Sequence, residues 1–219
     1  LGVNRASLFA QLPAAMQAGE QRSEASATGQ EDMFGLVAAA PVASERTSLG
    51  PAVAEWPMGH VRAHGAFEPV LLDLKAIDLP MLTASKHPRL GGYELPATQA
   101  WAAQVKACDA FAFVMPEYNH GLAPALVNAL DHLGAEWQYK ACSFVSYGGV
   151  SAGLRAVAAA KPVVSALKMV PLLEGVPIPF VTQLMSDGAF TGSETLEKSA
   201  RLMLDALRRW DGALRTLRT

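Results

Sequence analysis

The chain has 219 residues, 51% of them hydrophobic, and a formal net charge of -2 at pH 7, which is enough for one α/β domain with a sizeable core. It contains no run of Lys and Arg that would form a basic patch, and no apolar stretch near the ~20 residues that span a bilayer. We therefore expect a water-soluble, cytoplasmic protein with no nucleic-acid or membrane partner.

Residues 1–32 differ from the rest of the chain. The stretch GEQRSEASATGQED is polar, rich in small residues and without hydrophobic periodicity, which predicts a flexible N-terminal extension. The preceding residues are mildly amphipathic and lack acids. They fit a transit-type segment, an arm that packs on a partner subunit, or a remnant of the expression vector. The folded domain is expected over 33–219.

From residue 34 onward, apolar strand patterns alternate with helical patterns. Short apolar runs predict five strands, at 34–40, 69–74, 110–115, 141–147 and 175–181. The last of these contains prolines and is expected at a sheet edge. Helical patterns cover 51–63, 97–107, 124–133, 151–167 and 196–214. The alternation predicts an α/β fold with a doubly wound, five-stranded parallel sheet and helices on both faces.

Single residues refine the helices. Pro57 lies inside the first helix and is expected to kink or break it. Ser151 is the candidate N-cap of the helix over 151–167. An apolar face is predicted for the last helix, made by Leu196, Ala200, Met203, Leu207, Trp210 and Leu214.

The two cysteines and one pair of histidines are candidates for a disulfide or a metal site. Cys108 and Cys142 lie in apolar surroundings beside predicted strands, which favours buried thiols in a reducing compartment over a disulfide or a metal site. His60 and His64 are spaced i, i+4 on one helix. That is a spacing found in metal sites, but the sequence offers no third ligand, which favours a solvated helix face.

Three loops follow strands and precede helices, at 43–50, 116–121 and 146–153. In a doubly wound sheet, ligands bind outside the carboxyl ends of the strands, where the strand order reverses. The backbone N–H groups at helix starts are free to bind a ligand there. The first loop is rich in hydroxyls and has one Arg, the second is polar and aromatic, and the third has paired glycines. Together they could hold a phosphorylated, flat ligand.

The stretch MPEYNHGLAPALVNALDHL, followed by Trp137, Lys140 and FVSYGGVSAGLRA, resembles the NADPH-dependent FMN reductase family of flavodoxin-like flavoproteins. The resemblance covers roughly residues 34–215. It implies bound FMN, reduction by NADPH or NADH, a small-molecule electron acceptor, and a homodimer or homotetramer with the flavin near the subunit interface.

The resemblance also implies roles for individual residues. The isoalloxazine ring would be wrapped on one side by Pro116, Glu117, Tyr118, Asn119, His120 and Gly121. The opposite edge of the ring would face Tyr147, Gly148 and Gly149. The FMN phosphate would be held by Ser44, Arg46 and Ser48. The chemistry would belong to the flavin, with His120 as the candidate proton donor; many loop histidines, however, are merely solvated.

The first loop departs from the family pattern. Ala43 stands where the family has a glycine, the loop is one residue shorter before Gly50, and a second arginine is absent. This departure supports a second hypothesis, a flavodoxin-like binding or regulatory subunit with impaired flavin binding. Arg155 has three interpretations: a contact with a phosphate of the nicotinamide cofactor, a contact with a carboxylate at a subunit interface, or a surface ion pair. Loop 83–93 is the candidate for the acceptor side.

The function expected from these patterns is an FMN-dependent NAD(P)H oxidoreductase. Hydride would pass from NAD(P)H to flavin N5, and then to a quinone, free flavin or another acceptor, with ping-pong kinetics. A reductase that feeds reduced flavin to a partner monooxygenase has the same sequence features. The sequence does not separate NADH from NADPH.

Overall fold

The computed structural model describes residues 32–38 and 49–218. Their parallel strands are β1 (Asp32–Ala38), β2 (Phe67–Asp73), β3 (Ala110–Pro116), β4 (Ala141–Tyr147) and β5 (Val170–Pro171). The strands lie in the order β2-β1-β3-β4-β5. This is the flavodoxin-like order, in which the direction of winding reverses between β1 and β3. The predicted α/β fold is confirmed.

The fifth place in the sheet is shared by two short strands. β5 and β6 (Val176–Ile178) both pair with β4 in parallel. The single strand expected over 175–181 is therefore wrong in detail. Prolines lie in both short strands, and a proline cannot donate a hydrogen bond to a neighbouring strand. A separate hairpin of β7 (Met185–Ser186) and β8 (Ala189–Phe190) follows.

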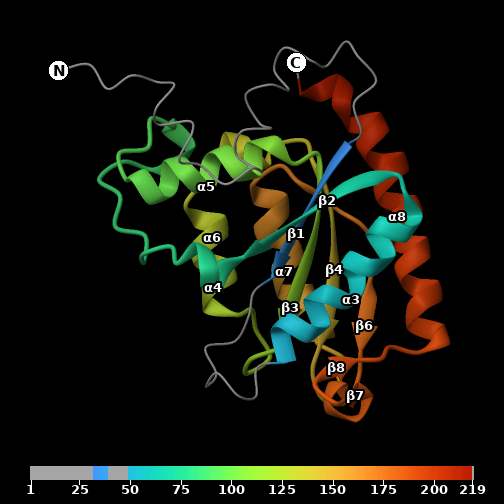
Figure 1. Cartoon of the computed structure of the whole chain (residues 1–219). Coiled ribbons are helices and arrows are strands. Elements are labelled where there is room, and N and C mark those ends of the chain that lie inside the picture. Colours follow the sequence, from blue (N-terminus) through green and yellow to red (C-terminus); the bar gives the residue numbers. More distant parts are fainter. Residues whose placement is uncertain (1–31, 39–48, 219) are drawn as a thin grey trace.

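Helices cover both faces of the sheet, as the alternating pattern predicts (Figure 1). One apolar core lies between the sheet and the helices α3 (Leu49–His64) and α8 (Glu194–Leu214). The other lies beneath α5 (Pro96–Ala107), α6 (Pro124–Asp131) and α7 (Leu154–Ala166). Every residue of the two central strands β3 and β4 is buried, because both of their faces are covered.

Short helical segments occupy several connections. They are α4 (Leu74–Ile77), η1 (Pro88–Leu90), η2 (Ala135–Trp137), η3 (Val181–Leu184) and η4 (Arg215–Leu217). The expected break at Pro57 does not occur, since α3 continues to His64. Pro57 is itself buried with Val53, Met58 and Val61, so packing against the sheet holds the helix together across the missing N–H.

The predicted helix face of α8 is correct except at one position. Trp210 is 46% exposed, whereas its neighbour Asp211 is buried at 1%. The carboxylate of Asp211 accepts hydrogen bonds from Arg215 Nη2 (2.8 Å) and from Arg218 Nη2. Arg215 and Arg218 also form ion pairs with Asp32 and Asp109, respectively. These charges form a clasp, Asp211–Arg215–Arg218, that joins the end of α8 to the starts of β1 and β3.

The side chains of Cys108 and Cys142 are both buried thiols, as expected from their surroundings. The histidine pair of α3 does not form the solvated face expected for it. His64 Nε2 lies 3.0 Å from Asp205 Oδ1 of α8, and the ring of His60 packs edge-on against Trp56 at 4.3 Å between centroids. Among the described residues there is no cluster of three His, Cys, Asp or Glu side chains that could hold a metal.

Lys140 is a buried cation at the C-terminal end of α5. Its Nζ donates to the carbonyl of Val105 at 2.8 Å and to that of Lys106 at 3.3 Å. Both carbonyls lie in the last turn of α5, where a helix lacks its regular partners, although Val105 O also accepts from the C-cap amide Cys108 N at 3.2 Å. Burial lowers the pKa of Lys140 to about 8, although Cys108 and Asp109 oppose the shift.

We expect the free energy of unfolding to rise with pH between about 8 and 10.5 because of Lys140. In this window the unfolded chain still binds the proton that the folded protein has released, so deprotonation favours folding. The rise should be on the order of 3 kcal/mol, since one pKa unit is worth about 1.4 kcal/mol. Urea unfolding of the wild type and Lys140→Met across this range measures it, because the titrations of groups that do not interact with Lys140 cancel in the difference. Parallel pH curves for the two proteins would contradict this expectation.

Candidate functional site

The loop after β3, residues 116–121, is a tight hairpin that we call the β3 loop. Tyr118 N donates to Gly121 O at 3.1 Å, and Gly121 N donates to Tyr118 O at 2.8 Å. The central residues Asn119 and His120 have φ of 49° and 66°, as a two-residue type I′ turn requires. Both side chains are exposed. The buried strand therefore ends abruptly because the chain reverses over two residues in the left-handed conformation.

The loop after β4, residues 148–153, is the β4 loop. Ala152 and Gly153 have φ of 52° and 78°. A Cβ on Gly153 would lie 2.8 Å from Tyr147 N and from the Ser146 Cβ, so this corner requires glycine. Gly149 differs, because no atom lies within 4 Å of the place its Cβ would take. Space for a ligand is therefore open beside Gly149.

A third segment packs against the β4 loop. Phe180 N donates to Gly149 O at 3.1 Å, and Val181 N donates to Gly148 O at 3.2 Å. Phe180 has a φ of 46°, and its side chain is 47% exposed. A left-handed phenylalanine is strained, and such residues are concentrated at functional sites. The sequence offers no pattern that marks Phe180, so sequence reasoning misses this contact.

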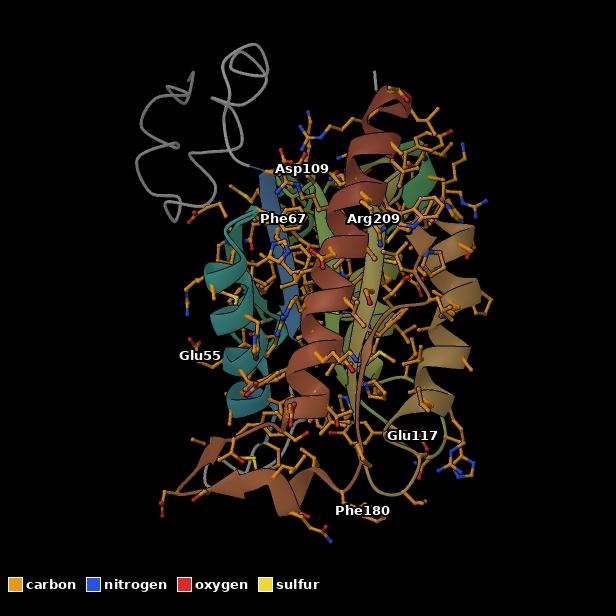
Figure 2. The ribbon with its side chains drawn as sticks, turned by 90° about the vertical axis from the view of Figure 1, so that its right-hand side faces the viewer. Glu55, Phe67, Asp109, Glu117, Phe180 and Arg209 are labelled. Carbon is orange, nitrogen blue, oxygen red and sulfur yellow. The ribbon has the colours of Figure 1, made fainter. Side chains whose placement is uncertain are left out.

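Glu117 links the β3 loop to the start of α7. Its carboxylate accepts hydrogen bonds from Arg155 Nε at 2.6 Å and from Arg155 N at 3.1 Å. Burial of the carboxyl opposes the shift, but the hydrogen bonds from Arg155 and Ser151 outweigh it and lower the pKa of Glu117. Arg155, whose side chain is 48% exposed, thus forms an ion pair within the chain, in line with the third of its interpretations. Glu117 and Phe180 lie at the same end of the molecule (Figure 2).

The candidate N-cap of α7 is wrong. The helix begins at Leu154, and its N-cap residue is Gly153, which has no side chain to cap it. The hydroxyl of Ser151 instead hydrogen-bonds the Glu117 carboxylate. The sequence predicts Ser151 as the N-cap because serine is a common capping residue. The left-handed turn at Ala152 and Gly153 delays the start of the helix from residue 151 to Leu154.

Unused hydrogen-bond donors gather at this edge of the sheet. The amide N–H groups of Asn119, His120, Gly149 and Val150 make no hydrogen bond to another described residue. The hydroxyl of Tyr147 is also buried without a partner among the described residues. Burial raises the pKa of Tyr147 far above its ordinary value, so the phenol stays protonated and able to donate. Unsatisfied buried polar groups are uncommon and suggest a missing partner.

The sequence-predicted residues are only partly brought together. Pro116 to Gly121 and Tyr147 to Gly149 lie at neighbouring strand ends, because Pro116 is in register with Tyr147. Ser44, Arg46 and Ser48 lie outside the described residues. They follow β1, whose last residue Ala38 is in register with Val114 of β3. The carboxyl end of β1 therefore lies beside that of β3, at the reversal of strand order.

Loop 83–93, the candidate for the acceptor side, lies elsewhere. Arg89 Nη2 donates to the carbonyl of Ala166 at the end of α7 (3.3 Å), which is the end of that helix away from the β4 loop. A cavity of about 150 Å³ beneath this loop is bordered by Thr98 and His132. The imidazole of His132 is fully occupied by Thr98 Oγ1 and the carbonyl of Pro80, each at 2.9 Å.

His120 can be tested separately from the rest of the β3 loop. It is exposed and has a φ of 66°, and a left-handed conformation costs a non-glycine residue about 1–2 kcal/mol. We expect His120→Gly to raise the free energy of unfolding by about 1 kcal/mol, since Asn-Gly is the favoured type I′ pair. We also expect turnover to change by less than about threefold, in contrast to the ~100-fold loss typical of a general acid. Urea unfolding and steady-state kinetics measure the two effects. A ~100-fold loss of turnover would indicate that His120 is a proton donor.

Comparisons with known proteins show the family of the chain. The sequence model of the NADPH-dependent FMN reductase family matches residues 38–183. An NAD(P)H-dependent FMN reductase of Schizosaccharomyces pombe is 38% identical over 122 residues, which are 54% of this chain and 59% of that protein. A probable NADPH:quinone oxidoreductase of Oryza sativa is 37% identical over 83 residues, 36% of this chain and 40% of that protein. The match thus spans less than two thirds of either relative.

A solved structure shows the same fold. FerB, a flavoenzyme NAD(P)H:(acceptor) oxidoreductase from Paracoccus denitrificans, is similar with a TM-score of 0.65 and 18% identity, over 84% of this chain and 98% of that one. Within the described residues no helix is both long and apolar enough to cross a membrane. Because the family match covers well over half of the sequence and includes both loops described above, the chain belongs to the NADPH-dependent FMN reductase family.

Proposed function

We propose that the protein is an FMN-dependent NAD(P)H oxidoreductase. The observation that carries this proposal is the group of unused backbone donors on two neighbouring loops, at the reversal of strand order. A flat ring with acceptor atoms on its edge complements such donors. The orphaned Tyr147 hydroxyl and the open space beside Gly149 fit the same ligand.

In this proposal the chain binds and orients, and FMN, when bound, accepts hydride from the nicotinamide and passes electrons to the acceptor. The N–H groups of Asn119 and His120 donate to one edge of the ring. Those of Gly149 and Val150 donate to another edge, where they stabilise negative charge that develops on reduction. Tyr118, which is 38% exposed, shields the ring from water on the β3 side.

The remaining roles extend this proposal to the rest of the reaction. Ser44, Arg46 and Ser48 hold the FMN phosphate. NADPH or NADH supplies hydride, and a quinone, free flavin or another small molecule accepts the electrons by a ping-pong mechanism. We place the protein in the cytoplasm as a homodimer or homotetramer.

The test is an anaerobic absorption spectrum of the purified full chain with FMN and then NADPH. The proposal predicts that FMN stays with the protein on gel filtration and that its visible absorbance bleaches after NADPH is added. Initial rates with a quinone should give parallel double-reciprocal lines. Failure to retain or reduce FMN would overturn the proposal. It would favour the binding or regulatory subunit instead, for which the altered first loop with Ala43 is the specific observation.

A further inference from the structure

Glu117 stands where the two central strands separate. Its backbone N–H donates to Tyr147 O at 3.1 Å, which continues the pairing of β3 and β4 by one residue. Beyond this point the β3 loop turns into its hairpin and the β4 loop turns toward α7. The side chain of Glu117 crosses from the first loop to the second, and only 6% of its surface is exposed.

The Glu117 carboxylate supplies what the start of α7 lacks. The first N–H groups of a helix have no partner within the helix, and Gly153 offers no side chain to cap them. Glu117 Oε2 accepts from Arg155 N at 3.1 Å, and Oε1 accepts from Arg155 Nε at 2.6 Å. A helix N-terminus favours an anion. The helix is therefore capped by a residue 38 positions earlier in the chain.

We propose that Glu117 is a positioning residue that holds the β3 and β4 loops in the relative arrangement needed to bind the flavin ring. Both carboxylate oxygens are already used by Arg155, and Ser151 adds a further hydrogen bond. Glu117 therefore acts through the loops and does not contact the ring itself, unlike the role that the family resemblance implies. This inference rests on the proposed function.

The first expected result concerns flavin affinity. Glu117→Ala removes the cap and the ion pair together, and we expect it to raise the Kd for FMN at least tenfold, measured by quenching of FMN fluorescence at pH 7. Arg155→Met leaves the cap on Arg155 N in place and should raise the Kd less. Glu117→Gln keeps an oxygen that can cap the helix, and should restore the Kd to within about threefold of the wild type.

The chain offers a matched control in Glu55, which pairs with Arg62 at 2.9 Å on the exposed side of α3. Glu55→Gln should leave the Kd unchanged. Rescue by Glu117→Gln would show that an uncharged oxygen is enough to cap α7. A direct contact with the ring is separated from positioning by a measurement made without flavin. The melting temperature of each variant shows that the titrated protein is folded.

Amide hydrogen exchange gives a second readout that needs no flavin. We expect Glu117→Ala to speed exchange at least tenfold for the Arg155 amide and for the two hydrogen-bonded amides of the β4 loop, Gly148 and Ala152, with β3 unchanged. An unchanged Kd and unchanged exchange in Glu117→Ala would overturn the inference. So would a Glu117→Gln variant as weak as Glu117→Ala. If the wild type itself fails to bind FMN, the proposed function fails, and the exchange result alone decides whether Glu117 holds the loops.

Discussion

Replacing Gly153 by alanine is expected to lower the free energy of unfolding by about 3 kcal/mol and to abolish tight FMN binding. The new Cβ would lie 2.8 Å from Tyr147 N and from the Ser146 Cβ, at a φ of 78°. The left-handed conformation costs about 1–2 kcal/mol, and forcing a methyl group into packed surroundings adds about 1–3 kcal/mol. Urea unfolding measures the loss, and the melting temperature should fall by roughly 2–4 °C per kcal/mol.

Gly149→Ala is the matched control in the same loop. No atom lies within 4 Å of the position of its Cβ, so the free energy of unfolding should change by less than about 0.5 kcal/mol, as at other surface positions. The methyl group would, however, enter the space proposed for the ring, and the Kd for FMN should rise about tenfold. A Gly153→Ala protein as stable as the wild type would contradict the first expectation. Unchanged FMN affinity in Gly149→Ala would show that the flavin ring does not lie beside Gly149.

Asp211→Ala should be strongly destabilising although the residue removed is charged. Asp211 is 1% exposed, and its carboxylate is shared by Arg215 and Arg218. Removing one member of a buried ion pair leaves the partner charges uncompensated and costs about 3–5 kcal/mol. We expect a loss of about 3 kcal/mol, since Arg215 is 45% exposed and its guanidinium can turn toward water. Urea unfolding at neutral pH provides the measurement.

Asp205→Ala serves as the control for Asp211→Ala on the same helix. Asp205 pairs with His64 at 3.0 Å, but its side chain is 52% exposed, so water and salt weaken the pair. Its loss should shift the melting temperature much less than the loss of Asp211. High salt should reduce the Asp205 effect further. Equal shifts for the two variants would mean that burial of Asp211 contributes nothing to stability.

Most of the sheet could be predicted because its strands are buried on both faces. β4 lies at Ala141–Tyr147 and β3 at Ala110–Pro116, within one residue of the expected 141–147 and 110–115. A continuous apolar run is what a central parallel strand requires, so composition alone locates it. The fifth strand is harder to locate. It is divided into β5 and β6, each of which pairs with β4 in a register that includes a proline. A local sequence pattern does not reveal this pairing.

The errors in α8 and at the start of α7 share one cause. A sequence pattern predicts the burial or capping role of a residue from its type alone. Trp210 is apolar but exposed, and Asp211 is charged but buried because two arginines compensate it. Ser151 is a good capping residue, yet Glu117 supplies the cap from another loop. Contacts between residues far apart in sequence decide these cases. The roles of the ring-binding loops came from motif resemblance, and they stay predictions until FMN binding is measured.

The clasp at the end of α8 affects the order in which the protein folds during synthesis. Arg215 and Arg218, which Asp211 holds together, pair with Asp32 and Asp109 at the starts of β1 and β3. Synthesis runs from the N-terminus, so both strands leave the ribosome long before the arginines that fasten them. Contacts of such wide sequence separation form late, because the intervening chain must first be ordered. A nascent chain that stops short of Arg215 should therefore stay open to proteases at the amino ends of its strands.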